Sequence, residues 1–250
     1  MRVEALSTLE RLDDARMIFD EVWPSLESGT QVQPNLLKAL VHGGGYCAAA
    51  YIDDRPVAAS MGFIARRRMA EDAWQVYLHS HNAAVIDGFR DRHIGFALKT
   101  HQRAWAIEQG LSTIVWTFDP LVRRNARFNL LKLGIEVRGY EVNFYGEMDD
   151  AINEGDPTDR LLAWWDVTSE KAVRAAAGGL QPIDVAARRA DGASIREIVI
   201  PEDIVGERSR DRAAALAWRL QVREEFLSAF AQGFEVTGVT PSGNYVLERP

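Results

Sequence analysis

The sequence has a single cysteine, Cys47, so no disulfide can form within the chain. Few cysteines are typical of proteins of a reducing cytoplasm. Cys47 stands in the apolar run YCAAAYI, which favours a buried strand residue over a nucleophile. The first residues contain no apolar segment typical of a signal peptide, and no apolar run approaches the ~20 residues that cross a bilayer. We therefore expect a cytoplasmic protein with no membrane partner.

An excess of positive charge is also lacking. The chain has 29 lysines and arginines against 36 aspartates and glutamates, a formal net charge of −7. This composition argues against a broadly basic surface, so we expect no nucleic-acid partner. With 250 residues, 47% of them hydrophobic, the chain is long enough for one large domain and a smaller appendage.

Hydrophobic periodicity and turn residues predict interleaved strands and helices. Strands are expected over 1–7, 45–52, 57–68, 73–85, 112–119, 135–148, 160–167 and 195–201, and a hairpin over 234–250 with its turn at PSGN. Helices are expected from a capping box at Ser7 and Glu10 to Trp23, and over 33–42, 94–109, 123–133 and 211–232. Because the first strands are joined by short turns, we expect a mixed α/β (α+β) sheet with helices on both faces.

Residues 168–192 are rich in alanine and arginine and are interrupted by GG and QP, which is typical of a linker. We therefore expect a first domain over 1–167, a linker over 168–192 and a C-terminal extension over 193–250. In the extension, an apolar stripe follows one side of the helix: Ala213, Leu216, Leu220, Leu227 and Phe230. This stripe must be covered by the first domain or by a second subunit, and we expect a homodimer.

The stretch HSHNAAVIDGFRDRHIG, residues 79–95, holds three of the five histidines. His79 and His81 are two residues apart on a strand and point the same way unless a bulge intervenes. Such a pair can bind zinc, but a zinc site needs further ligands, and no C-x-x-C or H-E-x-x-H accompanies it. We therefore expect no metal, and a metal hydrolase is an alternative. His101 shares a helical face with Leu98 and Trp105, as a partnered core histidine does.

The segment GFRDRHIG links a strand to a helix. Helix N-termini expose unpaired N–H groups and a partial positive charge, which suits phosphate. Arg90 and Arg92 add cationic donors for phosphate oxygens. A phosphate site and a solvated surface turn both fit these residues.

The stretch from Arg90 to Gly95 resembles the acyl-CoA signature of the GNAT superfamily of N-acyltransferases. In that signature, Q/R-x-x-G-x-G/A, Arg90 takes the first position, His93 replaces the middle glycine and Gly95 takes the last. The order of predicted elements over 1–148 is also similar to the GNAT order, and RRNARFNLLKLGI resembles the family's helix that ends in K-L-G. The resemblance implies a GNAT-like, mostly antiparallel sheet flanked by helices, followed by a strand–helix–hairpin extension.

The resemblance further implies acetyl-CoA or another acyl-CoA as the donor substrate. Backbone groups of the turn would hold the pyrophosphate, and the strand edge would pair with the pantetheine amides. The implied cofactor-binding residues are Ala84, Val85, Arg90, Asp91, Arg92, His93, Ile94, Gly95, Asn125 and Asn129.

More narrowly, six segments between 74 and 167 resemble a bacterial subgroup of GNAT proteins: LHSH, ALKTHQRAWA, WTFDPL, NARFNLLKLG, NFYGEM and PTDRLLAWW. Some relatives of this subgroup are thought to succinylate amino acids alongside N-succinylamino-acid racemases. The resemblance therefore implies transfer of an acetyl or succinyl group to the amine of an amino acid or a related small molecule.

Acyl transfer to an amine needs a base for the amine proton and a donor for the carbonyl oxygen. Many GNAT enzymes carry a glutamate six residues before the position of Val85, and His79 stands there, so we expect His79 as the base, with His81 as the second candidate. The family's tyrosine acid corresponds to Leu130, so Tyr145, or else Tyr140, would have to replace it.

Three residues are candidates for substrate binding. Arg66, with Arg67 and Arg68 beside it in the run ARRRMAEDA, could clamp a carboxylate in bidentate geometry. Trp116 and Tyr140 could line the acceptor pocket, although such residues more often belong to a core. The main alternative to an N-acyltransferase is a non-catalytic acyl-CoA-binding or regulatory domain, because His93 replaces the signature glycine and Leu130 the tyrosine.

Overall fold

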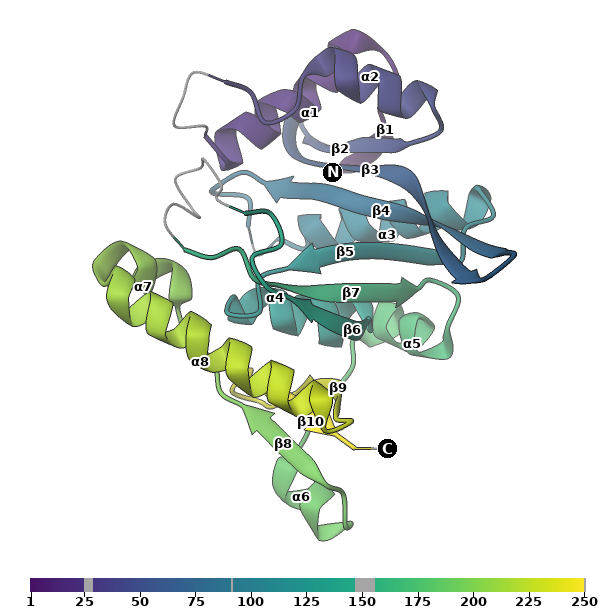
Figure 1. Cartoon of the computed structure of the whole chain (residues 1–250). Helices are drawn as coiled ribbons and strands as arrows, with labels where there is room; N and C mark the ends of the chain where they lie inside the picture. Colours follow the sequence, from purple (N-terminus) through teal and green to yellow (C-terminus); the bar gives the residue numbers. More distant parts are fainter. Residues whose placement is uncertain (25–28, 91, 147–155, 250) are drawn as a thin grey trace. The chain divides into compact units, whose positions relative to one another are not determined.

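The computed structural model describes residues 1–24, 29–90, 92–146 and 156–249 (Figure 1). These residues form two compact units, one over 1–116 and one from 117 onward. The boundary between the units thus falls after Trp116. The division of the chain into a catalytic domain over 1–167 and an extension over 193–250 stays a prediction.

The first unit is built on a sheet with the strand order β1-β2-β3-β4-β5. Its strands are β1 (Arg2–Ala5), β2 (Tyr46–Ile52), β3 (Arg55–Ala70), β4 (Ala73–Val85) and β5 (Thr113–Phe118). Neighbours from β1 to β4 pair in antiparallel fashion, and β5 runs parallel to β4. The prediction of a mixed, mostly antiparallel sheet is therefore confirmed.

Helices cover both faces of this sheet. They are α1 (Leu9–Val22), α2 (Pro34–His42) and α3 (Ile94–Glu108). Tyr51 of β2 donates a hydrogen bond to Asp14 of α1 (2.7 Å), whereas the hydroxyl of Tyr46 lies 2.9 Å from Nδ1 of His101 in α3. Because Tyr46 and Tyr51 are an odd number of residues apart on one strand, α1 and α3 lie on opposite faces. The contact with Tyr46 also confirms His101 as a partnered histidine.

The start of α1 differs from the prediction by one residue. Thr8, not Ser7, is the N-cap: its Oγ1 accepts from the Arg11 amide (3.4 Å), and its carbonyl accepts from Leu12 (2.9 Å). The capping box at Ser7 and Glu10 is therefore wrong. The carbonyl of Ser7 instead accepts from Lys38 of α2 (2.7 Å), so Ser7 precedes the helix.

The second unit contains the antiparallel strands β6 (Glu136–Glu141) and β7 (Arg160–Asp166), and a small sheet of order β8-β10-β9. The small sheet is formed by β8 (Ile195–Ile198), β9 (Glu235–Val239) and β10 (Tyr245–Glu248). Its helices are α4 (Arg123–Arg127), α5 (Glu170–Gly178), α6 (Val185–Ala190), α7 (Ile204–Arg210) and α8 (Arg212–Ala231), with the π-helix η1 (Phe128–Leu133) after α4. The predicted strand–helix–hairpin order is present, and α7 is an addition to it.

Residues 168–192 are not an extended linker, because α5 and α6 lie within them. Ala172 and Ala175 of α5 are buried. Gly134, at φ +69°, allows the close approach of α5: a Cβ there would lie 2.9 Å from the carbonyl oxygen of Lys171. Small residues in this segment therefore serve helix packing, which its composition alone does not reveal.

Helix α8 buries a different face from the one that its leucines predict. Its buried residues are Ala215, Arg219, Val222, Phe226 and Ala229. Leu216, Leu220 and Leu227 are 40%, 48% and 43% exposed. The three leucines of the predicted stripe are thus exposed, whereas Phe230 is half-buried beside Phe226. The buried face is organised around an arginine that hydropathy does not mark as buried.

Candidate active site

A β-bulge interrupts β4 in the stretch that holds the paired histidines. Ser80 is opposite Gly62 and Asn82 is opposite Met61, so His81 is the extra residue. The two imidazole rings still lie close together, with 6.1 Å between their centroids. Phe63 of β3 contacts both, with centroid distances of 4.8 Å to His79 and 6.0 Å to His81. The bulge thus leaves both histidines beside the same aromatic ring.

The histidines lie where two parallel strands stop pairing. Strands β4 and β5 pair at Leu78–Ile114 and His79–Val115, and no further pair between them is present in the described part of the chain. Strand β4 continues to Val85, and β3 pairs with its other edge as far as Ala58–Val85. The edge of β4 that includes Ala84 and Val85 is therefore not paired with β5, and it leads from the histidines toward α3.

The turn between β4 and α3 carries the predicted cationic residues. Arg90 forms an ion pair with Asp87 (3.0 Å), and the guanidinium of Arg92 lies 5.3 Å from the centroid of the Phe89 ring. Arg90 and Arg92 are exposed. Asp91, predicted to bind the cofactor, lies outside the described residues. Two of the predicted cations are therefore open to an anionic ligand.

His93 has the left-handed backbone conformation for which glycine is best suited, which accounts for the glycine that the acyl-CoA signature has at this position. It is the N-cap of α3, with φ 60° and ψ 10°, in the left-handed region that glycine adopts most easily. Ile94 behind it is buried and fixes the start of the helix. The substitution of glycine by histidine therefore retains the turn at the cost of backbone strain.

Gly95 faces open space. A Cβ placed there would meet only Cγ2 of Val85, at 3.8 Å. None of the described residues packs so closely that it requires a glycine at this position. It leaves room for a ligand to approach the first turn of α3, whose amide groups lack helical partners.

Burial keeps the candidate base neutral. Desolvation, followed by the charges of His81 and Lys99, lowers the pKa of His79 to about 4. Desolvation also lowers the pKa of His81. Both imidazoles are therefore neutral near pH 7 and have a nitrogen that can accept a proton.

Two residues that the sequence did not single out lie next to these histidines. Ser80, between them on β4, is buried, and so is Lys99 of α3, whose Nζ donates to its hydroxyl (2.9 Å). A signal was present: Lys99 and Gln102 occupy the same helical stripe as the buried Ala106. Polar residues on a buried stripe indicate a built interaction.

The predicted tyrosines belong to the second unit and differ in accessibility. Tyr145 is 37% exposed, and its hydroxyl lies 3.0 Å from Oγ1 of Thr117. Tyr140 is buried, and its hydroxyl donates to the Asp159 carboxylate (2.7 Å). These contacts leave Tyr145 as the acid candidate and favour a structural role for Tyr140.

The predicted asparagines lie on the helical segment of α4 and η1. Asn125 is half-buried and is not a cap, because the N-cap of α4 is Val122. Asn129 and Leu130 are buried in η1. The predicted helix over 123–133 is present, and its second part is a π-helix, whose wide turn often occurs at functional sites.

Arg66 lies on the face of the sheet opposite to His79. Phe63 is paired with His79, and Arg66 lies three positions after Phe63 on β3, opposite Val76. Side chains an odd number of positions apart on a strand point to opposite faces of the sheet, so Arg66 points away from the His79 face. The guanidinium of Arg66 lies 4.4 Å from the centroid of the Trp74 ring. Arg67 shares the His79 face, so Arg67 rather than Arg66 is placed to meet a carboxylate on that side. Trp116 is 7% exposed and lies beneath Lys99, as a core residue does.

Two further chemistries find little support in the described residues. Burial raises the pKa of the Cys47 thiol to about 12, so it is the buried strand residue that was expected. Within the described ranges, no three histidine, cysteine, aspartate or glutamate side chains come together as a metal site would require. Nor does any helix there have the length and apolar character needed to span a membrane.

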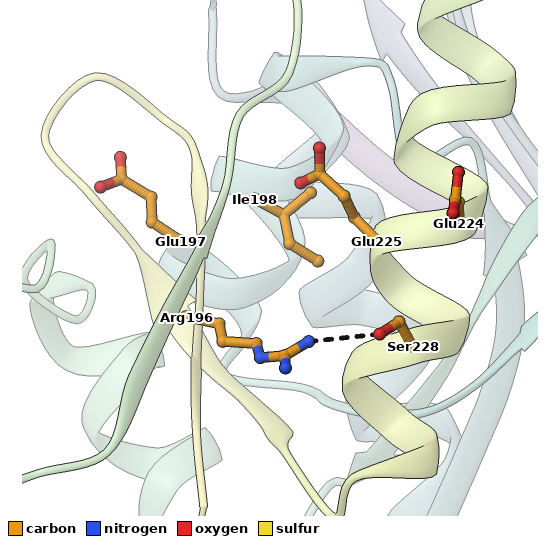
Figure 2. A pocket seen from close by; sticks show the side chains of 6 residues that line it. All are labelled: Arg196, Glu197, Ile198, Glu224, Glu225 and Ser228. Atoms are coloured by element: carbon orange, nitrogen blue, oxygen red, sulfur yellow. Dashed lines mark hydrogen bonds between the residues drawn. The ribbon is translucent and has the colours of Figure 1, made fainter.

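A hollow of about 370 Å³ lies in the second unit between β8 and α8 (Figure 2). Its lining is largely charged and polar: Arg196, Glu197, Ile198, Glu224, Glu225 and Ser228. Arg196 extends across it toward Ser228, with 3.4 Å between Nη1 and Oγ (Figure 2). None of the predicted site residues lines it.

Comparisons with known proteins place the fold. No protein-family model and no curated protein matches the sequence. Among solved structures, the ribosomal-protein-S18-alanine N-acetyltransferase of Escherichia coli matches with TM-score 0.50 and 13% identity over 67% of this chain and 94% of its own. An aminoglycoside 6'-acetyltransferase type Ii matches with TM-score 0.50 and 17% identity over 68% and 99%. Naa50 of Arabidopsis thaliana, in complex with the bisubstrate analogue CoA-Ac-MVNAL, matches with TM-score 0.50 and 15% identity over 66% and 98%. The chain therefore has the fold of N-acetyltransferases, as the GNAT resemblance implied.

Proposed function

We propose that this protein is an acyl-CoA-dependent N-acyltransferase. The observation that carries the proposal is the edge of β4 beyond His79, which no described residue of β5 pairs with and which leads to the N-terminus of α3. An extended ligand with an anionic end fits such a path, because a strand edge offers amide and carbonyl groups and a helix start offers N–H groups. The likeness in fold to N-acetyltransferases supports this reading.

The donor is acetyl-CoA or another acyl-CoA. Its pyrophosphate binds the backbone amides of 92–95, with Arg90 and Arg92 beside it, and its pantetheine arm pairs with Ala84 and Val85. Asn125 and Asn129 are assigned to the cofactor arm by the resemblance alone. The open space at Gly95 supports this placement, because a ligand can approach the helix without meeting a side chain.

His79 takes the proton of the attacking amine. The amine must be neutral to attack, and its nitrogen becomes strongly acidic as the bond to the acyl carbon forms. A neutral imidazole with a pKa of about 4 can accept the proton at that stage. His81 orients the acceptor, and Tyr145 is the proposed donor to the leaving thiolate.

The acceptor is a small amine, and an amino acid suits it best. Arg67 supports this class, because it shares a sheet face with His79 and a guanidinium matches a carboxylate. The same cation would suit a succinyl donor. We further propose a cytoplasmic location, on the single buried cysteine, and a homodimer, on the exposed leucines of α8.

The test is release of free thiol from a panel of acyl-CoAs, including acetyl-CoA and succinyl-CoA. Each is offered with pooled amino acids, polyamines, an aminoglycoside and a short peptide. Turnover with any acceptor supports the proposal and identifies the substrate class. CoA binding without turnover would favour the non-catalytic alternative. Stoichiometric zinc by elemental analysis together with no CoA binding would favour a metal hydrolase.

A further inference from the structure

Lys99 is a buried cation at the point where β4 and β5 separate. Its side chain extends from α3 and is 5% exposed. The ammonium donates to Oγ of Ser80 on β4 (2.9 Å) and to Oε1 of Gln102 on α3 (3.0 Å). It also lies 3.9 Å from the centroid of the Trp116 ring on β5. One charged group thus contacts three elements of the first unit.

Lys99 has no carboxylate partner among the described residues. Its hydrogen-bond partners are a hydroxyl and an amide, and its remaining contact is an aromatic ring. Burying an ammonium without a counter-charge costs free energy that a methionine in the same place would not. Stability of the fold therefore does not account for a lysine at this position.

The contacts of Lys99 converge on the candidate site. Ser80 lies between His79 and His81 and directly precedes the bulge. Trp116 directly follows Val115, which pairs with His79 at the last step before β4 and β5 part. We call the point after the His79–Val115 pair, where β4 and β5 separate, the fork. Lys99 therefore contacts one residue on each strand of this fork: Ser80 on β4 and Trp116 on β5.

We propose that Lys99 is a positioning residue of the site, whose ammonium, acting through Ser80 and Trp116, fixes the fork and the histidine-bearing bulge of β4. This deepens the proposed function and rests on it. Lys99 does not touch the reacting atoms, because its side chain meets the strands from the α3 face, whereas His79 lies on the opposite one.

The charge of Lys99 adds an electrostatic consequence. After burial and the charge of His81, the ammonium is the remaining cause that lowers the pKa of His79. Among the described residues, the charged groups that act on the pKa of His79 are His81 on β4 and Lys99 on α3. Burial lowers the pKa of Lys99 to about 7. Lys99 thus helps to keep the base unprotonated, most strongly below about pH 7, where it is itself charged.

The experiment compares Lys99→Met, Ser80→Ala and the wild type. His79 is titrated by NMR of the full-length protein without substrate, and kcat is measured with the best acyl-CoA and acceptor pair. Lys171→Met is the matched control, since Lys171 is a half-buried lysine of the second unit whose Nζ, among the described residues, donates to a backbone carbonyl, that of Ile135.

We expect Lys99→Met to raise the pKa of His79 by about half a unit or more, because a like charge is removed. It should lower kcat about 10- to 100-fold, the range of a slight misplacement of catalytic groups, without lowering the urea midpoint. Ser80→Ala should lower kcat but change the His79 titration less, since the charge stays. Lys171→Met should change neither kcat nor the titration.

An unchanged His79 titration together with wild-type kcat in Lys99→Met would overturn the proposal. So would a loss of stability that accounts for the loss of kcat, because Lys99 would then serve only the fold. If the wild type uses no acyl-CoA, the proposed function fails. The titration still decides whether Lys99 acts on His79.

Discussion

His79 of β4 and Val115 of β5 form the last pair between these two parallel strands. The candidate base therefore stands at the start of the unpaired edge, where a ligand lying along β4 would present its reactive end. At the other end of this edge, the turn of Arg90, Arg92 and His93 leads into α3. A donor whose anionic group is held at the helix would have its acyl group near the histidines.

Gly95→Glu should abolish CoA binding while keeping the protein folded. A carboxylate in the first turn of a helix interacts favourably with the helix dipole, so the stability of the protein should be unchanged or slightly higher. The same carboxylate repels a bound pyrophosphate, so CoA binding should weaken. We expect a loss of CoA affinity of about 100-fold or more, measured by isothermal titration calorimetry.

Gly95→Ala is the matched control, because its Cβ would meet only Val85, at van der Waals distance. It should fold normally and bind CoA far more tightly than the glutamate variant. Wild-type CoA affinity in Gly95→Glu would show that the pyrophosphate does not bind at this helix.

The order of elements in the first unit was predictable because each leaves a local signal. Asp53 and Asp54 both take positive φ in the two-residue turn between β2 and β3, and aspartate is among the residues that tolerate this conformation. Pro34 marks the start of α2. Each of these signals lies within a few residues, in the sequence, of the turn or helix end that it predicts.

The parts that were missed depend on contacts between distant segments. The bulge at His81 is a matter of register with β3, and Lys99 is buried because Ser80 and Trp116 meet its charge. The buried face of α8 is set by Arg219, whose carboxylate partner Asp119 is 100 residues away. Hydropathy treats both cations as surface residues. The helical stripe that Lys99 shares with Gln102 and Ala106 is a local signal for its burial, whereas the partner of Arg219 lies far away in the sequence.

His79→Ala should lower turnover about 10²- to 10⁴-fold if His79 is the general base. The lowered pKa also changes the expected pH dependence. The neutral, proton-accepting form of His79 predominates above about pH 4. The turnover rate should therefore rise with pH around pH 4 as His79 loses its proton, and the contribution of His79 should be constant near neutrality. An ordinary histidine would place the limb near pH 6.5. Steady-state kinetics from pH 4 to 8 separates the two cases.

His81→Ala is the comparison for the base. It should cost less than His79→Ala and act mainly on the KM of the acceptor. The reverse order of effects would make His81, the bulged residue, the base. If neither substitution lowers turnover, the proton leaves through water or the backbone.

His93→Gly should stabilise the protein without weakening CoA binding. A non-glycine residue in the left-handed region costs roughly 1–2 kcal/mol, part of which is offset by the greater freedom of glycine in the unfolded chain. We expect the free energy of unfolding in urea to rise by up to about 1 kcal/mol. His93→Val should lower it. A fall in CoA affinity in His93→Gly would instead show that the imidazole contacts the cofactor.

Leu220→Glu tests whether α8 forms an interface between subunits. Leu216, Leu220 and Leu227 are exposed on one side of α8, and large exposed apolar side chains in one stripe indicate a surface that another molecule covers. If that molecule is a second copy, sedimentation should show a dimer for the wild type and a monomer for Leu220→Glu. Leu36→Glu, at an exposed leucine of α2, should leave the dimer intact. A monomeric wild type would refute this prediction.

Removing Arg219 should destabilise the protein strongly. Arg219 is 1% exposed and donates to both oxygens of Asp119, at 2.8 and 3.0 Å. Burial acts to raise the pKa of Asp119, but Arg219 and then Arg208 outweigh it and hold that pKa well below its ordinary value. Arg219→Met should therefore cost about 3–5 kcal/mol of unfolding free energy, because a buried charge loses its main partner.

Two further variants check this prediction: one that also removes the charge of Asp119, and one that lacks the C-terminal residues. Asp119→Asn combined with Arg219→Met should recover much of the loss, since neither charge then remains. Deleting 193–250 removes both arginines, together with Phe226, whose ring centroid lies 5.5 Å from that of Tyr140. The truncated chain should aggregate, because an aspartate and an apolar surface lose their cover. A soluble, active truncation, or an Arg219→Met variant as stable as the wild type in urea, would show that this buried network contributes little to the fold.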